Sequence, residues 1–109
     1  MSHNALICDR FKFMKPPVAI ERYREQIRKI VQAHNARNPR VFGSVVHGED
    51  VEGSDLDILV DPNESMTYFD LMSIALDVKE LAGIKVDAKT PKDLSEKFRN
   101  KVLAEALPI

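Results

Sequence analysis

The chain has 109 residues, with 16 Lys or Arg against 17 Asp or Glu, so its formal net charge is −1. This length suits one domain that buries a core without disulfide bonds, and its single cysteine, Cys8, cannot form an internal one. The charge argues against direct DNA binding, which needs a basic surface. No apolar run approaches the roughly 20 residues of a membrane span. The first 15 residues lack the apolar core of a secretory signal, so we expect a cytoplasmic protein.

The first predicted element is an amphipathic helix that begins at Pro16 and ends near Asn35. The residues on its apolar face recur at helical spacing and are Ile20, Tyr23, Ile27, Ile30, Val31 and His34. Residues 1–15 leave two interpretations open, a disordered leader or an early start of this helix. Pro39 is expected to break the chain, so that residues 40–42 form a short strand that stops at Gly43.

Alternating apolar side chains predict two further strands, at 56–60 and at 84–88. The first of these presents Leu56, Ile58 and Val60 to the core and ends at Pro62. Between the two strands, Thr67 and Asp70 form a capping-box pattern for a helix that ends at Gly83.

A last helix is expected to begin at Thr90-Pro91 and to run to about residue 106, because a capping threonine followed by proline is typical of a helix start. The whole order is helix, strand, turn, strand, helix, strand, helix. It predicts an α/β (α+β) domain over residues 16–109, with a small mixed sheet of three to four strands and helices packed on it.

Three carboxylates are expected on one face of that sheet. Asp55 and Asp57 are two residues apart in a strand, so their side chains point to the same open face, away from the core. Asp87 has the corresponding place in the strand at 84–88 and joins them if the two strands are neighbours. Carboxylates this close raise one another's pKa unless a cation compensates. Mg²⁺ suits such a site, and a pair of ions can stabilise both oxygens of a phosphoryl displacement.

A second feature is the turn that Gly43-Ser44 opens after the strand at 40–42. Its free backbone N–H groups could bind an anion. Glycine and serine are common in turns, so the pair alone says little. Here it is followed by Gly48 and then by Ser54-Asp55-Leu56-Asp57, which is a much rarer arrangement. The combination pairs a phosphate-binding turn with a metal site.

The stretch from Val41 to Gly48, together with that from Ser54 to Val60, resembles the signature of the DNA polymerase β-like nucleotidyltransferase superfamily. The resemblance is strongest to its minimal nucleotidyltransferases, and it extends over residues 16–109 as a single nucleotidyltransferase domain. It implies a nucleotidyltransferase-like fold.

The resemblance also implies roles for six residues. Asp55, Asp57 and Asp87 would be the catalytic residues and would bind Mg²⁺, as a pair of ions, with Asp87 helping to activate an acceptor hydroxyl. The residues implied to bind the nucleotide, ATP or another NTP, are Gly43, Ser44 and Ser54.

For function, the resemblance implies an antitoxin that transfers AMP, or another NMP, to a hydroxyl group of a HEPN-domain ribonuclease toxin encoded next to it. The modified residue would be a tyrosine. A chain of this size has no added domain to hold an acceptor, so the acceptor site would come from the partner. Two alternatives remain open: a non-catalytic antitoxin that acts by binding, and a small-molecule nucleotidyltransferase that needs a second subunit. Homo-oligomers and hetero-oligomers are both compatible with the sequence.

Overall fold

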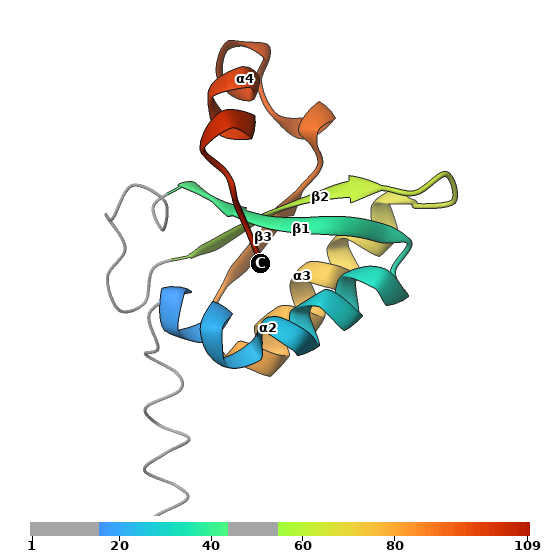
Figure 1. Cartoon of the computed structure of the whole chain (residues 1–109). Helices are drawn as coiled ribbons and strands as arrows, with labels where there is room; N and C mark the ends of the chain where they lie inside the picture. The colour runs from blue at the N-terminus through green and yellow to red at the C-terminus, as the bar shows by residue number, and fades with distance from the viewer. Residues whose placement is uncertain (1–15, 44–54) are drawn as a thin grey trace, which may run out of the picture.

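The structure is a computed structural model and describes residues 16–43 and 55–109 (Figure 1). In chain order its elements are α2 (Pro16–Ala33), β1 (Ala36–Phe42), β2 (Leu56–Pro62), α3 (Tyr68–Ala82), β3 (Val86–Lys89), the single 3-10 turn η2 (Pro91–Asp93), α4 (Glu96–Glu105) and β4 (Leu107–Pro108). The predictions made for residues 1–15, for the turn after Gly43 and for Ser44 and Ser54 lie outside the described residues. Within the described ranges, no helix combines the length and hydropathy that a membrane span requires.

The four strands form one mixed sheet in the order β3-β2-β1-β4. β1 is antiparallel to both β2 and β4, whereas β2 and β3 are parallel. A parallel pair needs a long crossover connection, and α3 supplies it. The sheet therefore confirms the predicted mixed arrangement, and it makes the two acid-bearing strands direct neighbours.

Helices cover both faces of the sheet. α2 and α3 lie together on one face, and α4 lies on the other (Figure 1). The core between the sheet and the helix pair includes Ile27 and Val31 of α2, Ile58 of β2 and Ile74 of α3, all fully buried. Full burial of each such side chain contributes roughly 1.5–3 kcal/mol.

The predicted alternation along β2 is confirmed, because Leu56, Ile58 and Val60 are all fully buried in this core. The opposite face, however, is not open along its whole length. Leu59 points to that face and is also fully buried, and η2, which precedes the buried Leu94, contacts β2 there. The carboxylates therefore share their face with a covered apolar region.

β1 is longer than expected, because it begins at Ala36 and passes through Pro39. Proline cannot donate a hydrogen bond to a neighbouring strand, and it is tolerated here because the register with β2 shifts between Arg37 and Arg40. On the other side, the Pro39 carbonyl accepts a hydrogen bond from the Ile109 N–H at 2.9 Å. β4, which the sequence did not predict, thus pairs with the strand that Pro39 was expected to interrupt.

The end of the chain also differs from the prediction. Instead of one helix from Thr90 to about residue 106, the chain forms η2, extends at Leu94 (φ −81°, ψ 141°) and then forms α4. The Asp93 carboxylate accepts hydrogen bonds from both the backbone N–H and the hydroxyl of Thr90, which closes a single turn. Leu94 then leaves the helical path with its side chain buried.

α3 begins and ends where the sequence predicts. The Thr67 hydroxyl accepts from the Asp70 N–H, and the Asp70 carboxylate accepts from the Thr67 N–H at 2.9 Å, which is a complete capping box. Gly83 ends the helix in a left-handed conformation (φ 73°), and its N–H donates to the Lys79 carbonyl. The third strand begins two residues later than predicted, at Val86, and extends to Lys89, while Ile84 before it is buried.

Candidate active site

The two parallel strands bring two of the predicted acids together. Asp57 of β2 is paired in register with Asp87 of β3, so their side chains leave the same face of the sheet at neighbouring positions. Asp55 immediately precedes β2 and has the same parity as Asp57. The side chains of Asp55 and Asp87 are about half exposed, at 50% and 52%, and Asp57 is the more buried of the three.

Lysines lie beside the two exposed carboxylates. Lys85 Nζ is 3.9 Å from Asp55 Oδ2, and Lys89 Nζ is 3.8 Å from Asp87 Oδ2. Exposed pairs at such distances stabilise a protein little, because solvent screens them and the side chains remain mobile. These lysines therefore do not fix the carboxylates firmly, and the acids can turn toward a stronger cation.

Among the described residues, no lysine lies within ion-pair distance of Asp57. Burial raises the pKa of Asp57 above its ordinary 3.8, and the nearby charges of Asp87 and Asp55 raise it further, while Lys89 opposes them. The described residues therefore compensate the negative charge of Asp57 only in part. A cation placed between the strands would relieve this repulsion.

The donor set suits a hard divalent cation, because Mg²⁺ prefers carboxylate oxygens. Over the described part of the chain, no three His, Cys, Asp or Glu side chains already surround one point as a metal ion requires. Asp55 and Asp87 lie near lysines instead. The site thus offers the right oxygens on adjacent strands.

Gly43 is held against the same carboxylate. It follows β1 with φ 79°, a conformation that favours glycine, and Phe42 before it is paired in register with Asp57. A Cβ at Gly43 would overlap Asp57 Oδ2 and lie 3.2 Å from its Cγ. The sequence predicts phosphate binding at Gly43 but not this contact, which depends on the register of β1 with β2.

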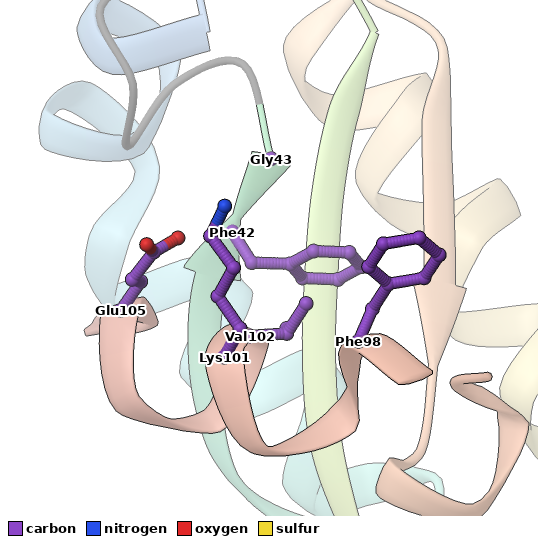
Figure 2. Close-up of a pocket in the computed structure, with 6 residues that line it drawn as sticks. All are labelled: Phe42, Gly43, Phe98, Lys101, Val102 and Glu105. Carbon is purple, nitrogen blue, oxygen red and sulfur yellow. The ribbon is translucent and has the colours of Figure 1, made fainter. Parts of the chain in front are cut away.

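A cavity of about 280 Å³ adjoins Gly43, between the end of β1 and α4 (Figure 2). Its lining residues are Phe42, Gly43, Phe98, Lys101, Val102 and Glu105. Phe98 lies on α4 and is 58% exposed, and no motif in the sequence marks it as a site residue. Only the packing of α4 over the sheet shows that this ring faces a cavity beside the carboxylates.

Comparison with known families gives a match to the nucleotidyltransferase domain over residues 20–109. Among characterised sequences, the chain is 33% identical over 91 residues to the protein adenylyltransferase MntA of Thermococcus cleftensis, covering 76% of this chain and 92% of that protein.

Solved structures show the same fold. A structure described as a minimal nucleotidyltransferase has a TM-score of 0.76 and 36% identity, with 88% of this chain and 97% of that one covered. A toxin–antitoxin complex with AMP-PNP has a TM-score of 0.62 at 18% identity, covering 73% of this chain and 66% of that one. Complexes of MntA with HepT are among the other structural relatives. The likeness to these complexes is one of fold.

Proposed function

We propose that this chain, which belongs to the nucleotidyltransferase domain family and is by homology a protein adenylyltransferase, transfers AMP from ATP to a hydroxyl group of a helical toxin. The observation that carries the proposal is the arrangement of Asp57 and Asp87 in register on adjacent strands, with Gly43 packed against Asp57. Phosphoryl transfer depends mainly on such positioning and on charge neutralisation.

Asp55, Asp57 and Asp87 would hold Mg²⁺. When bound, the metal supplies the positive charge that neutralises the phosphates of the nucleotide. Gly43 would let the backbone approach those phosphates. Ser44 and Ser54, which adjoin the described segments in sequence, would also bind the nucleotide. The added positive charge would stabilise the charged form of Asp57, whose pKa is raised mainly by burial.

Asp87 would take the proton of the acceptor hydroxyl. The hydroxyl oxygen forms a bond to the α-phosphorus of ATP, the bond from that phosphorus to the β-phosphate oxygen breaks, and pyrophosphate leaves. The products are an AMP ester of the acceptor and pyrophosphate. Asp87 is about half exposed and lies on β3, an edge strand of the sheet, where an acceptor on another protein could reach it.

The acceptor protein would be a HEPN-type ribonuclease encoded beside this chain, modified on a tyrosine. Two observations support this choice. The described residues place acids and a glycine together, and structural relatives occur as MntA–HepT toxin–antitoxin complexes. The acceptor site then comes from the partner.

The test compares Asp57→Asn with Asp61→Asn in an assay of labelled AMP transfer to the partner with Mg²⁺. Asp61 is a matched control, because it lies on β2 with the same parity but pairs with Arg40 at 2.6 Å. We expect Asp57→Asn to slow transfer by at least about 100-fold, since changing a residue that merely supports a metal ligand costs roughly 10–100-fold. Asp61→Asn should retain activity.

Three results would contradict the proposal. Wild-type transfer by Asp57→Asn would remove the acids from the mechanism. Labelled product found only in the low-mass fraction would indicate a small-molecule nucleotidyltransferase. Full protection of cells from the toxin by Asp55→Asn, at stoichiometric levels, would indicate an antitoxin that acts by binding alone.

A further inference from the structure

The cavity between β1 and α4, called here the α4 cavity, is continuous with the proposed active site. Gly43 forms part of its wall and is also the residue that packs against the Asp57 carboxylate. Phe42, another wall residue, is the register partner of Asp57 on the neighbouring antiparallel strand, so the two side chains leave the same face of the sheet. A group in the cavity would therefore lie next to whatever Asp57 holds.

Three residues form a row across this face. Asp87 on β3, Asp57 on β2 and Phe42 on β1 are paired in register, and α4 lies beside Phe42, with which it lines the cavity (Figure 2). In the proposed reaction the acceptor hydroxyl meets Asp87, at the far end of the row. If the phosphates of the nucleotide lie at Asp57 and Gly43, its sugar and base extend away from Asp87, toward α4 and the cavity.

The chemistry of the cavity suits a flat aromatic ring with a polar edge. Phe42 and Phe98 both line the cavity, and Figure 2 shows the Phe42 ring extending across β2 toward the Phe98 ring. Lys101 of α4 places an amino donor on the wall of the cavity. The edge of adenine presents hydrogen-bond acceptors and an amino donor. An exposed phenyl ring stacks well on a base.

We propose that the α4 cavity holds the base of the donor nucleotide, stacked against Phe98; this inference rests on the proposed nucleotidyl transfer. Phe98 would set affinity for the nucleoside part of ATP, while Gly43 and the carboxylates act on its phosphates. The cavity thus separates the donor from the acceptor, which enters at the Asp87 side.

The test measures binding of two probes, ATP and inorganic triphosphate, by calorimetry with Mg²⁺. The variants are Phe98→Ala and a matched control, Phe69→Ala, since Phe69 is an exposed phenylalanine (79%) on α3, which lies on the other face of the sheet. We expect Phe98→Ala to weaken ATP binding about 10-fold, within the range known for loss of base stacking, and to leave triphosphate binding unchanged. Phe69→Ala should change neither.

Two further variants guard against a folding defect. Phe98→Trp should keep ATP affinity near that of the wild type, because it retains an aromatic face, whereas Phe98→Leu should behave like Phe98→Ala. ATP affinity that is equal in wild type, Phe98→Ala and Phe98→Leu overturns the inference while leaving the proposed transfer intact.

Another result would assign the cavity differently. If Phe98→Ala binds ATP normally but raises the KM for the partner protein, the cavity receives an aromatic side chain of the acceptor, and the inference is wrong. If the wild-type protein binds neither ATP nor triphosphate, the proposed function itself fails.

Discussion

At the scale of single residues, Asp57 is the position where stability and function oppose each other. Burial and the charges of Asp87 and Asp55 all raise its pKa above the ordinary 3.8. The folded protein therefore resists the charged form that a cation site requires. Such a cost is typical of functional sites, where a substitution that removes activity often raises stability.

We expect Asp57→Asn to raise the melting temperature of the metal-free protein at neutral pH, because the amide removes the repulsion. The raised pKa means that the wild type binds this proton more readily when folded than when unfolded. The wild type is therefore least stable relative to the variant at pH values above the raised pKa of folded Asp57. The difference decreases as the pH falls from that pKa toward the ordinary value of 3.8. Thermal melts of both proteins at several pH values check this, and a variant that melts below the wild type at neutral pH would contradict it.

Added Mg²⁺ should change the same comparison. The ion should raise the melting temperature of the wild type, because a ligand that binds only the folded state stabilises it. Asp57→Asn should show little of this increase, whereas Asp61→Asn should show most of it. An equal rise for all three proteins would place the bound ion elsewhere.

Gly43 is the second residue whose identity follows from its surroundings. We expect Gly43→Ala to cost about 1–2 kcal/mol of stability from its positive φ alone, and to displace Asp57, which the added Cβ would overlap. AMP transfer should fall sharply. Gly83→Ala is the control, because it carries a similar φ of 73° at the end of α3, outside the site. Denaturant titration and the transfer assay measure the two effects, and equal activity of both variants would contradict this account.

At the scale of elements, local chemistry determined what could be predicted. Alternation identified the strands of Asp57 and Asp87, and the Thr67 capping box with Gly83 fixed both ends of α3. The start of β1 was missed because a proline usually ends a strand, and only pairing shows that Pro39 lies where the register shifts. The helix break at Leu94 was missed because apolar residues recur every four positions from Leu94 to Phe98 and Val102, as they would in one continuous helix.

The α3 capping box gives a pH-dependent prediction. The backbone N–H of Thr67 is the main cause that lowers the pKa of Asp70 below 3.8, with the Asn35 side chain and His34 adding to it. A lowered pKa stabilises the folded state above the ordinary value, and that contribution disappears as the pH falls through the lowered one. Asp70→Asn should therefore unfold at lower urea than the wild type at neutral pH, and the difference should shrink in acid.

The control for that experiment is Glu80→Gln, which changes an exposed acid on the same helix. It should follow the wild type at both pH values. If the difference in urea stability between Asp70→Asn and the wild type stays constant from neutral pH into acid, the stabilisation by the capping box does not depend on the charge of Asp70.

At the scale of the whole molecule, the sheet order decides what the site contains. The sequence places Asp55, Asp57 and Asp87 on one face of the sheet only if their strands are neighbours. The parallel pairing of β2 with β3 fulfils this condition. The contact of Gly43 with Asp57 and the cavity under α4 depend on β1 register and helix packing, which no local pattern encodes.

The two faces of the sheet have different tasks. α2 and α3 cover the core on one face, whereas the other face carries the acid pair, and there α4 lies beside Phe42. The Asp87 end of the row lies on β3, the edge strand of the sheet. The proposed acceptor would reach Asp87 from this edge of the sheet.

The most direct test of the central claim is the intact mass of the partner toxin after incubation with this protein, ATP and Mg²⁺. The account predicts a gain of one or more AMP units, which Asp57→Asn abolishes and Asp61→Asn preserves. A stable complex of the two proteins with no mass gain would contradict it, and would identify an antitoxin that acts by binding alone.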